Sequence, residues 1–416
     1  MTSSTGSVGE SAIHRGRGVL LALLVVSICI NYIDRGNLGV AAASPAFRAD
    51  LHLNEASLGV LFSMFFITYA SCQILFGWLI DRYSVYVVFT VGFVLWSAAT
   101  IFTGFVGGFT GLLVWRLVLG VGEAGAYPAY SKILAARFAE HERGRANSMI
   151  DAGSRLGPAI GVLAGGLIAA NYGWRMIFIA IGVAGLLWLI PWTWHVSRIR
   201  DGARKISAAA KAGPGLLAVL RRREAWGTFI GLFCLNYSWY FILSWLPSYL
   251  TSERHYSTRM MAWYGSLPFW AVAGTSLAFG WISDRLIQRG GSPTKVRLAC
   301  LGAGLTLNAL MIPAYLIQDQ VLSMALMVIA CLSLGVASSN LWAVTQTLAG
   351  PLTAGKWTGL QNGFGNIAGI TSPYIAGLIV AKTGSFFLVF VSASMVAVAG
   401  ALSFWLIVRK VEPVQW

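Results

Sequence analysis

The chain contains twelve apolar segments, each long enough to cross a lipid bilayer as a helix. A membrane-spanning helix needs about 20 predominantly apolar residues. Because hydrocarbon offers no water to bind backbone amides, each segment has to satisfy its own backbone groups, and an α-helix does so. The predicted spans, numbered 1 to 12, cover residues 19–41, 58–80, 86–106, 109–131, 147–170, 174–196, 226–250, 260–283, 297–317, 321–349, 357–381 and 385–408. The predicted fold class is therefore an all-α membrane protein.

Composition agrees with a surface that faces lipid. The chain is 57% hydrophobic and 11% charged, whereas soluble domains are about a quarter charged. The cysteines lie in apolar segments without a CxxC spacing, so we expect core residues and no metal site. They are Cys29, Cys72, Cys234, Cys300 and Cys331. No HExxH motif, nucleophile elbow or phosphate loop is present, so we expect neither an enzyme nor an organic cofactor.

Charge distribution predicts the sidedness of the chain. If both termini lie on one side, that side carries 22 of the 30 lysines and arginines, and the opposite side carries five. The remaining three, Arg35, Arg116 and Arg155, fall inside spans. Cytoplasmic loops hold the excess of basic residues, so both termini are predicted to be cytoplasmic. The formal charge of +15 thus reflects topology and attraction to anionic membrane lipid, not nucleic-acid binding.

The N-terminal segment has some features of a secretory signal peptide, with arginines, an apolar stretch and Ala41-Ala42-Ala43. However, its apolar stretch is longer than is usual for a signal peptide and is interrupted by Asp34 and Arg35. The charge pattern also requires this segment as a span. We therefore expect it to remain as span 1.

A repeat divides the chain into two halves. The sequence GWLIDR at 77–82 recurs as GWISDR at 280–285, after spans 2 and 8. The predicted organisation is a cytoplasmic tail (1–18), a six-helix half (19–196), a basic cytoplasmic linker (197–225), a second half (226–409) and a short tail (410–416). The predicted cytoplasmic gating residues in the two copies are Asp81, Arg82, Asp284 and Arg285.

Six ionisable residues lie at depth in the spans, all in the N-terminal half. They are Asp34, Arg35, Arg116, Glu123, Asp151 and Arg155. Charged groups inside a membrane are expensive and usually functional, although three acids and three bases could also form structural ion pairs. We expect Asp34 and Arg35 to neutralise each other while the site is empty. An arginine that binds an incoming anion would release its carboxylate partner to take up a proton.

Three further motifs identify a family resemblance. Residues 31–38 (NYIDRGNL), 116–129 (RLVLGVGEAGAYPA) and 236–250 (NYSWYFILSWLPSYL) resemble spans 1, 4 and 7 of the anion:cation symporters. These symporters belong to the major facilitator superfamily. The repeated sequence GWLIDR resembles the cytoplasmic-loop motif of that superfamily. The resemblance implies two pseudo-symmetric six-helix halves. It also implies proton-coupled import of an organic anion, such as galactonate, glucarate or a hexuronate, by a monomer in the bacterial inner membrane.

The resemblance also implies residue roles. Arg35 would bind the substrate carboxylate with its planar fork, and Asp34 and Glu123 would take up protons. Arg116 would pair with an acid or hold the outer part of the cavity. Contacts to the anion or its hydroxyls would come from Tyr32, Tyr69, Tyr240, Ser339, Trp342 and Asn362. Packing is the alternative role of the two aromatic residues in the second half, and Asn340 and Gln361 are the alternatives if the helix register differs by one.

The chain departs from this pattern at three places. Arg155 stands where a neutral polar residue would suit a sugar hydroxyl, so it favours a second carboxylate, as in dicarboxylates or phthalate-type aromatic acids. The alternative is that Asp151, four residues earlier, merely neutralises it. Residues 83–86 (YSVY) lack the usual glycine and basic residues, which predicts weaker gating. Residues 153–162 (GSRLGPAIGV) resemble an antiporter motif, but Val162 replaces its last glycine, so packing is favoured over an exporter.

Overall fold

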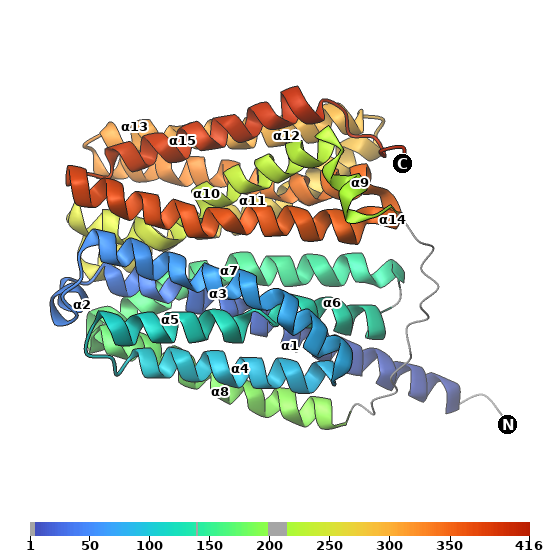
Figure 1. Cartoon of the computed structure of the whole chain (residues 1–416), viewed down its shortest axis with the longest axis horizontal. Coiled ribbons are helices and arrows are strands. Elements are labelled where there is room, and N and C mark those ends of the chain that lie inside the picture. Colours follow the sequence, from blue (N-terminus) through green and yellow to red (C-terminus); the bar gives the residue numbers. More distant parts are fainter. Residues whose placement is uncertain (1–4, 139, 199–213) are drawn as a thin grey trace.

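A computed structural model describes residues 5–138, 140–198 and 214–416, and these residues form helices and no strands. Figure 1 labels the helices, which are numbered and coloured along the chain. Their bounds are α1 (Thr5–Ala42), α2 (Pro45–Asp50), α3 (Glu55–Arg82), α4 (Val85–Thr103), α5 (Phe109–Glu123), α6 (Ala126–Arg137), α7 (Glu140–Tyr172), α8 (Trp174–Ser197), α9 (Leu216–Leu220), α10 (Arg223–Ser252), α11 (Thr258–Gln288), α12 (Pro293–Leu307), α13 (Met311–Leu316), α14 (Gln320–Thr383) and α15 (Phe387–Leu402). A 3-10 turn (Asn308–Leu310) joins α12 to α13, and a π-helical turn (Ser403–Val408) follows α15.

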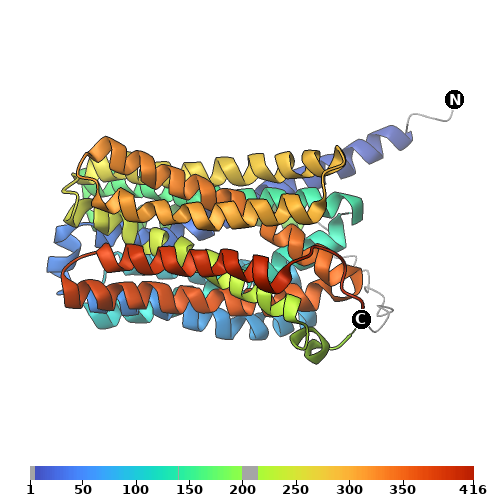
Figure 2. The ribbon, with the colours of Figure 1, turned by 90° about the horizontal axis from the view of Figure 1, so that it is seen from above.

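The helices form two bundles that lie side by side. Figure 1 shows α1 to α8 in one bundle and α10 to α15 in the other, with both ends of the chain at the same end of the molecule. Figure 2, seen from above, again shows both chain ends at one end of the molecule. Helix α14 contains two spans that turn back on each other at Gly350, whose φ of 65° suits glycine. The cavity described below lies between these bundles.

Eleven helical segments of the described part are long and apolar enough to cross a membrane. The remaining long helix, α11, has 31 residues and corresponds to predicted span 8, but its tryptophans, tyrosine, serines and charged end lower its hydropathy. The all-α fold is thus confirmed. Predicted spans 1 and 4 lie within the membrane-spanning segments Gly16–Ala42 and Phe109–Arg137. In addition, α1 extends back to Thr5, and a short break divides the second segment into α5 and α6. Of the predicted linker, residues 199–213 lie outside the described residues.

The two copies of the repeated loop motif use their acids in the same way. Asp81 pairs with Lys132 on α6 at 3.1 Å, and Asp284 pairs with Arg297 on α12 at 2.5 Å. The arginines of the motif instead lie over tryptophans of their own helices, Arg82 over Trp78 and Arg285 over Trp281. The acids therefore tie helix ends together, whereas both arginines remain exposed.

The bundles approach each other closely at the end away from the chain termini. A Cβ on Gly59 of α3 would lie 3.1 Å from the carbonyl oxygen of Pro373 and 3.2 Å from the Cα of Gly377, both on α14. One turn further along α3, the Ser63 hydroxyl donates to the carbonyl oxygen of Ile370 at 2.7 Å. Backbones this close require small residues, as is usual where membrane helices pack.

Candidate functional site

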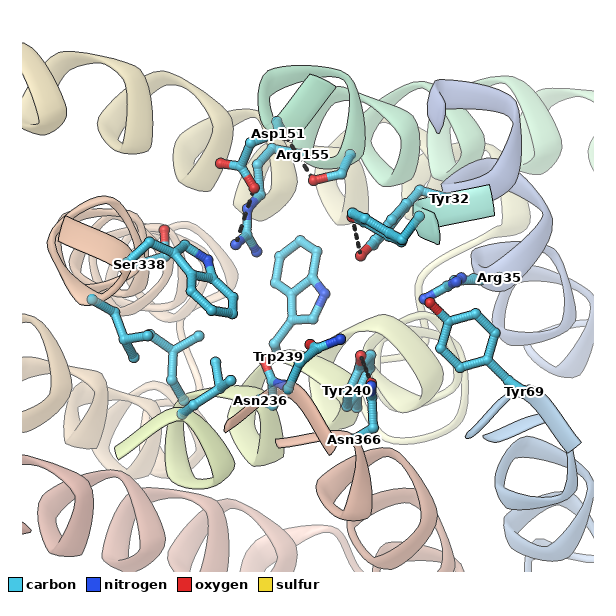
Figure 3. A pocket seen from close by; sticks show the side chains of 17 residues that line it. Tyr32, Arg35, Tyr69, Asp151, Arg155, Asn236, Trp239, Tyr240, Ser338 and Asn366 are labelled. Carbon is cyan, nitrogen blue, oxygen red and sulfur yellow. Dashed lines mark hydrogen bonds and ion pairs between the residues drawn. The ribbon is translucent and has the colours of Figure 1, made fainter. Parts of the chain in front are cut away.

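A cavity of about 140 Å³ lies between the two bundles. Helices α1, α3, α6 and α7 line it from one bundle, and α10 and α14 line it from the other (Figure 3). This places the cavity where substrates bind in transporters built from two repeats, at the interface of the repeats. The predicted site residues that line it are Tyr32, Arg35, Tyr69, Arg155, Tyr240, Trp342 and Asn362.

Arg35 is the centre of the charged side of this cavity. Its Nε donates to Oε2 of Glu123 at 2.8 Å, and both side chains are buried. The guanidinium carbon lies 4.7 Å from the ring centroid of Tyr32 and 4.5 Å from that of Tyr69. These cation–π contacts fix its direction. One terminal nitrogen, Nη2, has no partner among the described residues, so Arg35 retains a buried donor for a ligand at the cavity wall.

Asp34 does not neutralise Arg35, contrary to the prediction. Its Oδ1 accepts hydrogen bonds of 3.1 Å from Nδ2 of Asn37 and from the hydroxyl of Thr100 on α4. Consecutive residues on a helix point about 100° apart, so the two side chains face different neighbours. Asp34 consequently lies behind the cavity wall, buried inside the N-terminal bundle.

Arg116 is also behind the wall. Its side chain is buried, its guanidinium lies 5.4 Å from the ring of Phe65, and its Nε has no partner in the described part of the chain. It forms no salt bridge with any acid described here. Its charge nevertheless interacts with the buried carboxylates of Glu123 and Asp34, so its role beside an acid stays a prediction. Arg116 does not line the cavity.

The second bundle supplies neutral polar groups, with one correction of register. Ser338, not Ser339, lies at the wall; the Ser339 hydroxyl donates to the carbonyl oxygen of Val336 on its own helix. A shift of one residue on a helix turns the side chain by about 100°. The alternatives Asn340 and Gln361 are engaged elsewhere, since Asn340 accepts from Arg297 and Gln361 accepts from Thr345.

Several cavity residues were not predicted. They are Tyr127, Ser154, Leu232, Leu235, Asn236, Trp239, Ser338, Leu341 and Asn366, and Asp151, predicted only as a neighbour of Arg155, lines the cavity with them. Trp239 and Tyr240 lie three and four residues after Asn236, so both neighbour it on one face of α10. On α14, Asn366 lies one turn from Asn362, and its Oδ1 accepts from the Tyr240 hydroxyl at 3.3 Å. The spacing of polar residues within apolar helices was the signal that could have identified the polar members of this set.

Arg155 enters the cavity from α7. Its nearest acid is Asp151, at 4.0 Å between Nη2 and Oδ1. Its guanidinium lies 5.2 Å from the ring of Trp239, on the other bundle. The site thus contains two arginines with different surroundings. The described residues contain no group of three or more His, Cys, Asp or Glu side chains that could hold a metal ion.

Comparison with known proteins gives a consistent family. Residues 24–373 match the model of the Major Facilitator Superfamily. The probable sulfoacetate transporter SauU of Cupriavidus necator is 33% identical, over 93% of each chain. A D-galactonate transporter of Escherichia coli is 30% identical over 96% of this chain and 97% of its own. The probable galactarate/D-glucarate transporter GudP of Bacillus subtilis is 30% identical over 99% and 96%.

Solved structures agree on the fold. A bacterial homologue of the human lysosomal transporter Spinster, in an inward-facing and occupied conformation, superposes with a TM-score of 0.79. It covers 95% of this chain and 97% of its own, at 20% identity. The inward-facing, unoccupied form of a bacterial Spinster homologue gives a TM-score of 0.75 at 19% identity, over 95% and 96%.

Proposed function

Because this chain belongs to the Major Facilitator Superfamily, we propose that it is a proton-coupled importer of a small organic anion. The proposed substrates are sugar acids and related carboxylates, as named for relatives that align over nearly the whole chain. The proposed mechanism is alternating access, in which the bundles rock about the cavity between them. The proposed location is the bacterial inner membrane, with a monomer whose termini are cytoplasmic.

The observation that carries this proposal is the buried ion pair of Arg35 and Glu123. A buried pair is stable only while both charges are compensated. An anion that binds Arg35 competes with Glu123 for the same guanidinium, and the displaced carboxylate can then be neutralised by a proton. Substrate and proton would thereby bind together, which is the requirement for symport.

The test is an uptake assay in proteoliposomes with an imposed pH gradient. The panel contains galactonate, glucarate, hexuronates, phthalate and sulfoacetate, and we expect accumulation of at least one of them above the equilibrium level when the outside is acidic. Dissipating the gradient with a protonophore should remove the accumulation. Absence of uptake across the panel, or accumulation that is unaffected by the protonophore, would reject the proposal, and substrate-driven proton flow in the opposite direction would favour an exporter.

The contact of Gly59 with Gly377 provides a prediction about alternating access. Gly59→Leu should prevent the bundles from closing at this end, because even a Cβ there meets the backbone of α14 at 3.1–3.3 Å. We expect transport to fall at least tenfold, while substrate binding changes less than threefold. Binding by isothermal titration calorimetry and uptake by the same protein separate the two effects.

The matched control is Gly274→Leu on α11, where an added Cβ meets no atom within 4 Å. It should transport at the normal rate. Equal rates for both variants would show that close approach at Gly59 is not required for transport.

A further inference from the structure

The two arginines of the cavity differ in how strongly a neighbouring carboxylate compensates their positive charge. Arg35 forms a buried ion pair of 2.8 Å with Glu123. Arg155 is 4.0 Å from Asp151, which is longer than a hydrogen bond, and the Asp151 side chain is 44% exposed. A carboxylate with this much access to water interacts only weakly with its partner. Arg155 is therefore the positive charge at the cavity wall that the protein itself compensates least.

The position of Arg155 is nevertheless fixed. Its guanidinium packs on the ring of Trp239 at 5.2 Å, and its side chain is only 13% exposed. Two N–H groups in this region, Nε of Arg155 and the indole Nε1 of Trp239, have no partner among the described residues. Trp239 itself is 3% exposed. Buried donors are normally satisfied, so each of these unused donors indicates a missing acceptor.

The two arginines approach the cavity from different helices. Figure 3 draws Arg155 on one side of the Trp239 ring, and Tyr32 and Arg35 on the other. An acid group bound at Arg155 would therefore be distinct from the one bound at Arg35, with the body of the ligand passing the indole. The volume of about 140 Å³ is below that of pockets for drug-sized ligands, so the ligand is small.

We propose that Arg155 and Trp239 form a second anionic subsite, and that the preferred substrate is a small dianion with an acid group near each end. The inference rests on the proposed function and specifies its substrate class: dicarboxylates or carboxylate–sulfonates in preference to monocarboxylates. Arg155 supplies the charge, and the indole N–H donates to an oxygen of the ligand. A planar guanidinium suits either acid group because it can donate two parallel hydrogen bonds.

The test compares matched pairs of ligands on purified protein. Galactarate carries a carboxylate at its second end, where galactonate carries a hydroxyl. Sulfoacetate carries a sulfonate at its second end, where glycolate carries a hydroxyl. We expect the wild-type protein to bind the dianion of a pair more tightly. In Arg155→Gln, dianion affinity should fall about 10- to 100-fold, the range of a charged hydrogen bond, while monoanion affinity changes less than threefold.

Two further variants separate ligand binding from a structural role. Arg155→Lys keeps the charge and should recover part of the dianion affinity, whereas Arg289→Gln, at an exposed position outside the cavity, should not weaken dianion binding. Retained monoanion binding shows that the variants are folded. Equal losses for both members of a pair, no loss in Arg155→Gln, or a wild-type preference for monoanions would each overturn the inference. A wild-type protein that neither binds nor transports any of these anions would instead refute the proposed function.

Discussion

Replacing Arg35 with glutamine is expected to lower anion affinity at least 100-fold and to abolish uptake. Arg35 carries the buried positive charge beside the aromatic rings of Tyr32 and Tyr69, and its free Nη2 is available to a ligand. A 100-fold loss corresponds to about 2.7 kcal/mol, which is reasonable for a lost charged hydrogen bond together with the lost fork geometry. Isothermal titration calorimetry and proteoliposome uptake measure the two effects.

Folding has to be controlled in this experiment, because Arg35→Gln leaves Glu123 buried without its partner. Removal of one member of a buried pair typically destabilises a protein by about 3–5 kcal/mol. The double variant Arg35→Gln/Glu123→Gln removes both charges and should regain stability without regaining binding. Arg289→Gln, at an exposed position after α11, should behave like the wild type. Recovery of binding in the double variant would exclude Arg35 as the anion ligand.

Replacing Glu123 with glutamine is expected to abolish uphill uptake while sparing binding and exchange. Glutamine keeps the size of the side chain but cannot gain or lose a proton, so the pH gradient should no longer drive accumulation. Arg35 also loses its competing carboxylate, and the affinity for the anion should therefore be unchanged or higher. We expect accumulation under an inward proton gradient to fall at least tenfold, and counterflow between two substrate pools to persist.

Asp34→Asn provides a second measurement of coupling. Asp34 lies behind the wall, bonded to Asn37 and Thr100, so its replacement should affect coupling without removing a substrate contact. Glu412→Gln, at an exposed position near the C-terminus, is the matched control for loss of an acid. Full gradient-driven accumulation by Glu123→Gln would assign proton uptake to another group, and full accumulation by Asp34→Asn would remove that residue from the coupling role.

The fold could be predicted from sequence because the bilayer restricts the choices. Long apolar segments have to be helices, and the repeated motif after spans 2 and 8 divides the chain. Two local details of the helices were not predicted. The break between α5 and α6 lies at Ala124 and Gly125, inside an apolar segment whose hydropathy does not change at the break. The start of α1 at Thr5 lies before its apolar stretch, where hydropathy gives no signal.

The site was predictable in its residue types more than in its contacts. Buried charges stand out in a membrane helix, so Arg35, Glu123 and Arg155 were all identified. Their partners depend on helix rotation, which sequence fixes only to within a residue. That uncertainty explains why Asp34 was assigned to Arg35, and why Ser339 was chosen over Ser338. Trp239 was missed because the chain has 17 tryptophans, and composition does not distinguish a cavity residue from a packing one.

The contact of Gly59 with Gly377 has a consequence for the energy stored across the membrane. A symporter is useful only if protons cannot cross without substrate, and a water-filled gap at the closed end would permit such leakage. Two glycines that bring helix backbones together leave no side chains to move apart and little room for water. In the proposed cycle, this contact would prevent protons from crossing the closed end without substrate. Variants that loosen it would dissipate the proton gradient even in the absence of any anion.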